Sequence, residues 1–256
     1  MKLTLIAAAL LAATAASAQN QAATQTPEEQ SRATEVWSPV PKAVDTTGSA
    51  PSDAVVLFGG DNLDQWQTAK DGSPAGWTVG DGALTVKAGT GDIQSKQSFC
   101  DVQLHVEWRT PTDITGPDGK ELQSQDRNNS GVFLQGLYEV QVLDSYGPAK
   151  TYVNGQAGAV YKQSIPLVNA SRAPGVWQAY DIIYHAPHFD ASGAVTQKAR
   201  ITVLHNGVLV QDNFEIQGPT AWIGHPPYAA HGCRPISLQD HGHPVSYRNI
   251  WVRPLD

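Results

Sequence analysis

The stretch Val102-Gln103-Leu104-His105-Val106-Glu107-Trp108-Arg109 alternates strictly between apolar and polar residues. Because the side chains of a β-strand point to opposite faces with a period of two, this run predicts a strand with one buried face and one polar face. Further short apolar or alternating runs include Val55–Phe58, Tyr138–Asp144, Trp177–His185 and Val245–Val252. The chain is therefore predicted to consist of many short strands.

Turn signals separate these runs. The chain has 23 Gly and 17 Pro residues. Asn206-Gly207 stands between Arg200–His205 and Val208–Gln211, which is the strongest short-range signal for a β-hairpin. No long segment has a helical periodicity. Short strands without helices between them predict an all-β fold, either a sandwich or a jelly roll.

Composition excludes several classes of protein. Lys and Arg number 17 and Asp and Glu number 24, which gives a net charge of −7. Nucleic-acid binders and proteins of anionic membrane surfaces carry a basic face, so both classes are disfavoured. A hydrophobic content of 41% with 7 Trp and 8 Tyr residues disfavours a disordered chain.

The first residues have the pattern of a signal peptide. Lys2 precedes the apolar run Leu3–Ala13, and Ala16-Ser17-Ala18 forms a small-residue cleavage site. The run is too short to span a bilayer and no cysteine follows it, so no membrane anchor is expected. We therefore predict a signal peptide over 1–18, a low-complexity linker over 19–54 and a β-sandwich domain over 55–256. The mature protein is expected in the periplasm or outside the cell.

Cys100 and Cys233 are the 2 cysteines of the chain. In an oxidising compartment two cysteines can form a disulfide. Two separate thiols are the alternative, because the sequence does not give the Cα separation that a disulfide requires.

Polar faces of three predicted strands indicate a cleft. These faces carry His105, Glu107, Arg109, Glu139, Gln141, Gln239 and His241, and Asp240 adjoins the last two. If the three strands share one sheet, their carboxylates, amides and imidazoles form a surface suited to binding a sugar, with tryptophans for stacking. The alternative interpretation is an ordinary solvated face of an antiparallel sheet.

Ordinary glycoside hydrolysis is disfavoured by the run Glu139-Val140-Gln141-Val142-Leu143. Laminarinase-type glucanases carry three alternating acids on such a strand, whereas here an amide and a leucine replace the second and third. The pair of carboxylates that retaining hydrolysis needs is therefore missing. Asp240-His241-Gly242-His243 is a weak signal for a metal site, to which Glu139 or Glu107 would add an oxygen. No cofactor is evident, although a divalent cation is possible.

The chain resembles the family of 3-keto-disaccharide hydrolases in a series of runs that covers 55–253 in order. The matching runs are Leu57–Trp66, Trp77–Val79, Gly82–Leu84, Gly91–Lys96, Leu104–Arg109, Asn129–Phe133, Tyr138–Ser145, Gly158–Tyr161, Gly175–Gln178, Tyr180–Ile182, His205–Val208, Leu238–Gly242 and Tyr247–Ile250. The resemblance implies a concanavalin A-like jelly-roll sandwich. It also implies a small saccharide substrate in which C3 of a glucosyl ring is oxidised to a ketone.

The implied chemistry fits the missing acid pair. A C3 ketone acidifies the C2 proton, so one base can remove it, the glycosidic oxygen can leave by β-elimination, and water can add to the enone. We assign His241 as the base, Glu139 as its acid/base partner or a metal ligand, and Arg109 as the oxyanion stabiliser. A divalent cation could replace Arg109.

The remaining polar residues are assigned to the substrate. Gln141, Gln239 and Glu107 are expected to position hydroxyls, and Asp240 and His105 are further substrate-binding candidates. Two other functions stay open, a non-catalytic lectin-like module and a conventional glucan hydrolase, since a fold does not determine a function.

Overall fold

The computed structural model describes residues 25–255 of the chain. The predicted signal peptide, 1–18, lies outside the described residues. Among the described residues, 25–43 and 44–255 belong to two separate units. The described part of the first unit contains helix α1 (Pro27–Arg32), whose first turn is capped reciprocally by Thr26 and Glu29. Over 25–255, none of the helices has the length and apolarity needed to cross a membrane.

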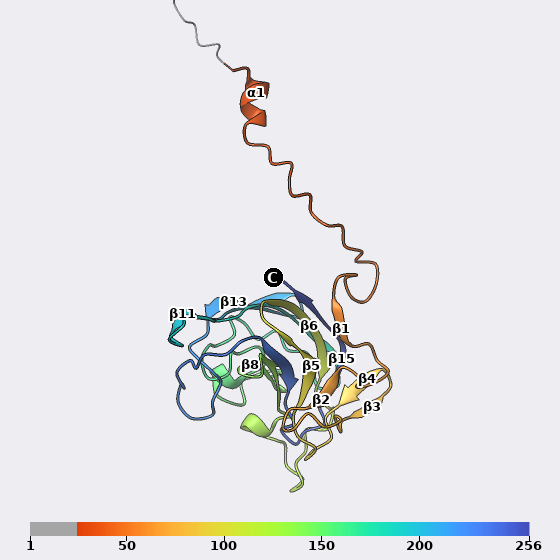
Figure 1. The fold of residues 1–256 in the computed structure, drawn as a ribbon. Helices are drawn as coiled ribbons and strands as arrows, with labels where there is room; N and C mark the ends of the chain where they lie inside the picture. Colours follow the sequence, from red (N-terminus) through yellow and green to blue (C-terminus); the bar gives the residue numbers. More distant parts are fainter. Residues whose placement is uncertain (1–24, 256) are drawn as a thin grey trace, which may run out of the picture. The chain divides into compact units, whose positions relative to one another are not determined.

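The second unit contains two antiparallel sheets (Figure 1). The larger, eight-stranded sheet has the order β13-β12-β9-β6-β15-β4-β3, and β1 also pairs with β15. Its strands are β1 (Val55–Phe58), β3 (Thr78–Gly80), β4 (Ala83–Thr85), β6 (Val102–Arg109), β9 (Gln178–His185), β12 (Arg200–His205), β13 (Val208–Glu215) and β15 (Ser246–Pro254).

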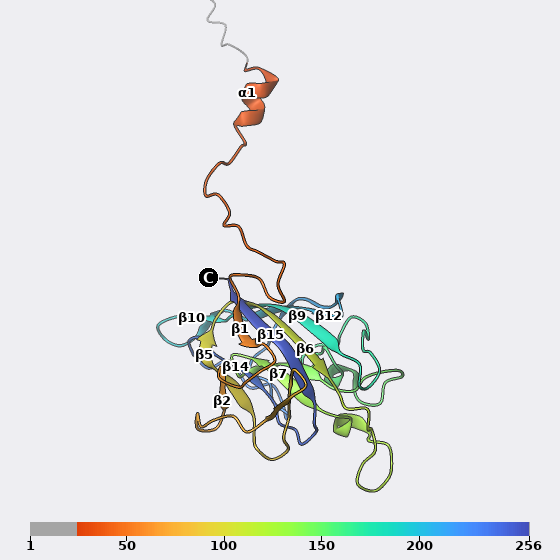
Figure 2. The same ribbon diagram turned by 90° about the vertical axis from the view of Figure 1, so that its right-hand side faces the viewer.

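The smaller, five-stranded sheet has the order β2-β5-β14-β7-β8. Its strands are β2 (Trp66–Thr68), β5 (Ile93–Phe99), β7 (Ser130–Leu134), β8 (Tyr138–Val142) and β14 (Arg234–Leu238). A separate ribbon pairs β10 (His188–Phe189) with β11 (Val195–Gln197), and two short 3₁₀ turns span Ser124–Asp126 and Val153–Gly155. The two sheets lie face to face as layers, so the predicted all-β sandwich is confirmed (Figure 2).

The core lies between the two layers. Strand β6 contributes its alternating apolar residues, which end in the fully buried Trp108, and β8 contributes Tyr138, Val140 and Val142. Each large side chain of this kind contributes about 1.5–3 kcal/mol when it leaves water. The period-two pattern of β6 therefore gives the burial that it predicts.

Strand β8 differs from β6 because both of its faces are buried. The segment 157–161 pairs along the free edge of β8, through the Gln141 N–H to the Ala159 oxygen (3.0 Å) and the Tyr161 N–H to the Glu139 oxygen (3.2 Å). A single-sequence pattern reads such a strand as half exposed. In the fold, the polar residues Glu139 and Gln141 of β8 are buried as well.

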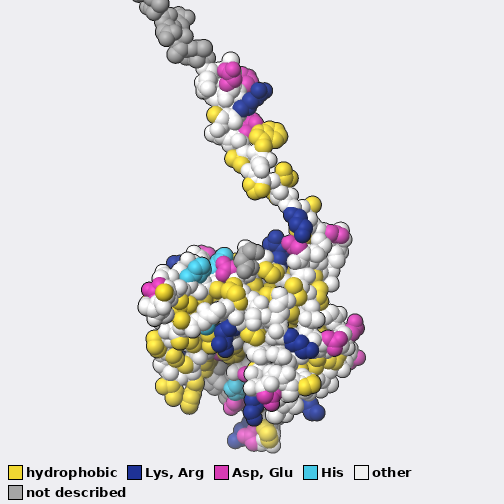
Figure 3. Space-filling view, viewed as in Figure 1, with side chains coloured by type: hydrophobic (Ala, Val, Ile, Leu, Met, Phe, Trp, Pro, Cys, Tyr) yellow, Lys and Arg dark blue, Asp and Glu magenta, His cyan; other side chains and the backbone are white. Residues whose placement is uncertain are grey.

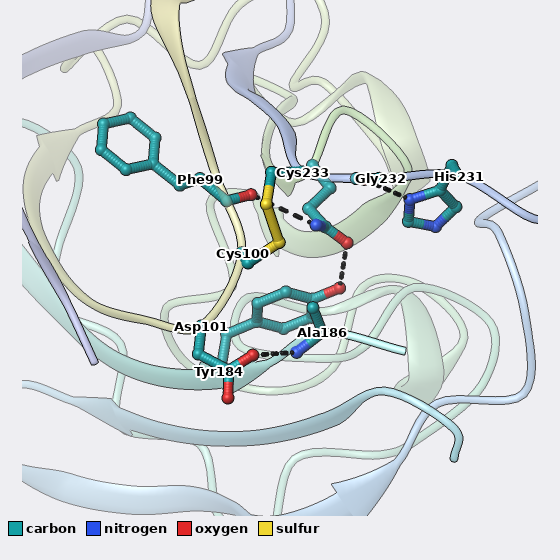
Figure 4. Close-up of a disulfide and its surroundings, with 9 residues drawn as sticks. Phe99, Cys100, Asp101, Tyr184, Ala186, His231, Gly232 and Cys233 are labelled. Carbon is teal, nitrogen blue, oxygen red and sulfur yellow. Dashed lines mark hydrogen bonds between the residues drawn. A yellow bond between two sulfur atoms is a disulfide. The ribbon is translucent and has the colours of Figure 1, made fainter. Parts of the chain in front are cut away.

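A disulfide joins Cys100 to Cys233 across 133 residues (Figure 4). It connects the turn between β5 and β6 to the residue before β14. Next to it, the Gln135 amide donates to the Phe99 oxygen (3.2 Å) and accepts from the Tyr184 hydroxyl (2.8 Å). The disulfide therefore links the end of the Gly218–Gly232 loop to the region between the two sheets.

Candidate functional site

A pocket of about 230 Å³ lies over the outward face of the five-stranded sheet. Its floor comes from β7 and β8, and its walls come from four loops, which carry Asn129, Tyr161, residues 220–222, and Gln239 with His241. The lining residues are Asn129, Phe133, Glu139, Gln141, Tyr161, Thr220, Ala221, Trp222, Gln239 and His241. Four of the predicted site residues, Glu139, Gln141, Gln239 and His241, therefore lie together.

Glu139 is the carboxylic acid of this lining. Its side chain is on the outward face of β8, and the residue is only 4% exposed. Burial raises the pKa of its carboxyl to about 8, and the negative charge of Asp92 adds to the increase. At neutral pH the group is therefore mostly protonated and can donate a proton, which is the state expected of a general acid.

Gly131 explains why the carboxyl fits where it does. In the register of β7 and β8, Gly131 lies opposite Gln141, and Phe133 lies opposite Glu139. A Cβ atom on Gly131 would come within 2.7 Å of Glu139 Oε1 and within 2.7 Å of the Phe133 ring. Only a glycine leaves space for the acid at this position.

Two glutamines give the pocket different polar groups. The Gln141 amide nitrogen donates to Asn129 Oδ1 (2.7 Å) and to the oxygens of Ser130 (3.1 Å) and Val142 (2.9 Å), so the protein fixes its orientation. Gln239 Oε1 is buried and has no hydrogen-bond partner among the described residues. Because an unpaired buried acceptor is costly, this oxygen is available for a donor such as a substrate hydroxyl.

His241 lines the pocket and packs against a second histidine, His243. The rings of His241 and His243 stack with centroids 5.8 Å apart and an interplanar angle of 8°. His241 is exposed and lines the pocket. Burial lowers the pKa of His243, and the neighbouring His241 lowers it further. Nδ1 of His243 accepts from the Asn129 N–H (3.3 Å). His243 is thus held as a neutral ring against His241.

Asp240 holds the turn that carries His241. Its carboxylate accepts from the N–H groups of Gly91 (2.9 Å) and Gly242 (2.9 Å), and its own N–H donates to Asp92 Oδ1 (2.8 Å). It does not belong to the pocket lining. The structure therefore places Asp240 beneath the site, and not in contact with the pocket where a substrate-binding residue was predicted.

The expectation that His105, Glu107 and Arg109 share this surface is wrong. Strand β6 belongs to the eight-stranded sheet, where it pairs with β9 and β15. A period of two assigns side chains to a face of one strand, but distant backbone pairing decides which sheet the strand joins. The three residues therefore lie outside the pocket, and Arg109 is not placed to stabilise an oxyanion there.

On the eight-stranded sheet these side chains have other partners. His105 Nδ1 lies 2.6 Å from an Asp181 oxygen, and Glu107 accepts from Arg248 Nε at 2.6 Å. The guanidinium of Arg109 lies 4.6 Å from the centre of the Trp177 ring. This is a cross-strand polar ladder that stabilises the sheet.

Sequence reasoning missed three important lining residues, Tyr161, Thr220 and Trp222. Burial, followed by the hydrogen bond with Tyr152, raises the pKa of Tyr161, so its hydroxyl stays protonated. Thr220 Oγ1 accepts from the Glu139 N–H (3.0 Å). The available signal for Thr220 and Trp222 was the Pro- and Gly-rich composition of the loop Gly218–Gly232, whose residues 220–222 line the pocket.

Metal ligands are not clustered in the part of the chain that the structure describes. Within 25–255, no group of three or more His, Cys, Asp or Glu side chains is arranged to hold a metal ion. A divalent cation stays a prediction, and no step of the chemistry below passes through one.

The fold and the pocket define a β-sandwich protein with a partly open pocket, in which a buried carboxyl lies among amides, hydroxyls and aromatic rings. The chain belongs to the family of 3-keto-alpha-glucoside-1,2-lyase-like domains, which residues 53–253 match. The predicted family is thereby confirmed.

Known relatives support this family assignment. A 3-keto-disaccharide hydrolase of Bacteroides thetaiotaomicron is 26% identical over 238 residues, which are 79% of this chain and 78% of the relative. A provisionally assigned glycosyl hydrolase of Parabacteroides distasonis, solved at 2.13 Å, is 49% identical, with a TM-score of 0.84 over 91% of this chain and 99% of that one. A second from the same organism, 19% identical with a TM-score of 0.58 over 80% and 94%, shares the fold. The family and these relatives support a carbohydrate hydrolase.

Proposed function

We propose that the protein cleaves the glycosidic bond of 3-keto-glucosides by elimination followed by hydration. The observation that carries the proposal is the buried Glu139, whose raised pKa makes it an acid at neutral pH in a pocket otherwise lined by amides, hydroxyls, rings and one imidazole. The name of the Bacteroides relative supports the same substrate type.

The steps balance as follows. A base takes the C2 proton, and the electron pair of the C–H bond moves into an enolate spread over C2, C3 and the ketone oxygen. The enolate then re-forms the ketone, its C2=C3 electron pair becomes a C1=C2 double bond as the C1–O bond breaks, and the leaving oxygen takes a proton. Water finally adds its hydroxyl to C1 and its proton to C2, which gives net hydrolysis.

The residues of the pocket divide these tasks. His241 is the proposed base, since imidazole is the commonest general base at neutral pH. Protonated Glu139 is the proposed acid for the leaving oxygen. Because Arg109 lies on the other sheet, we assign stabilisation of the enolate to the Tyr161 hydroxyl, while Gln239 Oε1 accepts from a sugar hydroxyl.

A conventional glucan hydrolase fits the pocket less well. Retaining and inverting hydrolysis both use a pair of carboxylates around the scissile bond. The lining of this pocket contains the carboxyl of Glu139 and no second one. A lectin-like module remains the other alternative, and a turnover measurement separates it from an enzyme. Export to the periplasm or the medium stays a prediction from residues 1–18.

We expect turnover only of oxidised sugars. The purified protein would be incubated with trehalose, a β-glucoside and the 3-keto form of each, and the released sugar would be measured. Cleavage of the 3-keto sugars alone supports the proposal. Cleavage of the unoxidised sugars would indicate a conventional hydrolase, and binding without cleavage would indicate a lectin-like module; either result contradicts the proposal.

A further inference from the structure

A second pocket adjoins the first and has Trp222 as a common wall. It has a volume of about 260 Å³ and is lined by Tyr152, Asn154, Lys162, Trp222, Gly224 and His225. The two pockets also meet along the chain, because Tyr161 lines the first and Lys162 lines the second. A ligand held in the first pocket can therefore extend past Trp222 into the second.

Lys162 is the centre of an aromatic cluster. Its ammonium group lies 5.4 Å from the centre of the Tyr152 ring, 5.8 Å from that of Tyr161 and 5.9 Å from that of Trp222. It also donates to the Trp222 backbone oxygen at 2.6 Å. These contacts hold the ammonium beside Trp222, the residue that the two pockets share. They also attach the loop of Trp222 to the segment of Tyr161 and Lys162.

The backbone at Lys162 supports a role beyond surface solubility. Its φ is +59°, in the left-handed region that a lysine rarely adopts. Such a conformation is common at ligand sites, where the surrounding structure fixes it. Here the Lys162 N–H donates to the Asn154 oxygen (2.8 Å), which holds two lining residues of the second pocket together.

The chemistry of the second pocket suits a sugar ring. Tyr152 and Trp222 offer aromatic faces for the C–H side of a pyranose, and both are exposed, Trp222 to 72%. Lys162, Asn154 and His225 offer polar groups for hydroxyls. Hydrophobic side chains also gather at the lower left of the β-domain, while charged ones are scattered (Figure 3). A neutral ring with one apolar face thus fits this pocket.

We infer that the pocket around Lys162 and Trp222 binds the leaving-group sugar of a 3-keto-disaccharide, with the oxidised ring in the pocket of Glu139. The inference rests on the proposed function. It assigns the leaving-group sugar to a defined pocket, and it makes Lys162 a residue that determines specificity. Its contribution is to hold the leaving group, while Glu139 supplies the proton.

The test compares two substrates that differ only in the leaving group, 3-keto-trehalose and methyl 3-keto-α-glucoside. In Lys162→Met, which keeps the length of the side chain and removes the ammonium, we expect kcat/KM to fall about tenfold for the disaccharide. For the methyl glycoside it should change less than twofold. Free glucose, which mimics the leaving sugar, should inhibit methyl glycoside turnover more weakly in this variant than in the wild type.

Ile223→Ala is the matched control. Ile223 adjoins Trp222, is 77% exposed and lines neither pocket, so both substrates should keep their wild-type kinetics. Thermal unfolding of each variant checks the fold. An equal effect of Lys162→Met on both substrates, or no effect on either, would overturn the inference. If the wild-type protein cleaves neither 3-keto substrate, the proposed function itself fails.

Discussion

Glu139→Gln is expected to lower kcat for 3-keto-glucosides by about 10²–10⁴-fold, the usual contribution of a general acid. Glutamine has nearly the shape of the protonated carboxyl and fits beside Gly131, so binding should be retained while proton donation is lost. Steady-state kinetics on methyl 3-keto-α-glucoside measure the effect. In the wild-type protein the rate should also fall as the pH rises through about 8, where the acid loses its proton.

Glu107→Gln provides the control for this experiment. Glu107 is a partly buried carboxylate on the other sheet, bonded to Arg248 and Asn249, and it does not line the pocket. Its substitution should leave kcat within about twofold of the wild-type value. Near wild-type turnover by Glu139→Gln would remove Glu139 as the acid. A large loss in Glu107→Gln would contradict the assignment of the two sheets.

Glu139→Gln also tests whether burial raises the pKa of the Glu139 carboxyl. The carboxyl has a pKa of about 8 in the folded protein and an ordinary value of 4.5. Between pH 4.5 and pH 8 the folded protein keeps this proton, whereas the unfolded chain has released it. The contribution of the protonated carboxyl to the free energy of unfolding is therefore full below pH 4.5 and is lost as the pH rises towards 8. From pH 5 to pH 8, the free energy of unfolding measured with urea should fall more in the wild-type protein than in Glu139→Gln, by a few kcal/mol.

The Cys100→Ser/Cys233→Ser double variant is expected to lower the free energy of unfolding by about 2–5 kcal/mol. The disulfide closes a loop of 133 residues, so the reduced unfolded chain gains much conformational freedom. Urea denaturation of the two proteins without reductant measures the difference.

Wild-type protein that is reduced and alkylated should unfold with the free energy of the double variant, since both lack the same link. Reductant should leave the double variant unchanged. A difference below about 0.5 kcal/mol between oxidised wild type and double variant would contradict a stabilising disulfide, because that is the range of neutral surface changes.

Local pattern was sufficient to predict many of the strands and their faces, although it did not predict β2 and β5. The alternation in Val102–Arg109 appears as alternating buried and half-buried side chains, and Asn206-Gly207 forms the turn between β12 and β13. On β8, the same reasoning placed Glu139 and Gln141 on one face, where they line the pocket together. These features depend on backbone geometry within one strand or one hairpin.

Long-range pairing explains what the pattern could not predict. His105, Glu107 and Arg109 are on the correct face of their strand but in the other sheet, because β6 pairs with β9 and β15. Tyr161 and Trp222 reach the pocket from loops, where no periodicity exists. The buried state of Glu139 depends on those loops, so its raised pKa was also invisible in the sequence.

Deuterium at C2 of the oxidised ring tests the central claim most directly. With methyl 3-keto-α-glucoside labelled at C2 and cleaved in ordinary water, proton removal at C2 predicts a slower reaction of the labelled substrate when that step limits the rate. It also predicts a released 3-keto-glucose in which C2 has exchanged deuterium for hydrogen from the medium. Cleavage at an unchanged rate, with the deuterium fully retained at C2 of the product, would contradict elimination and favour direct displacement at C1.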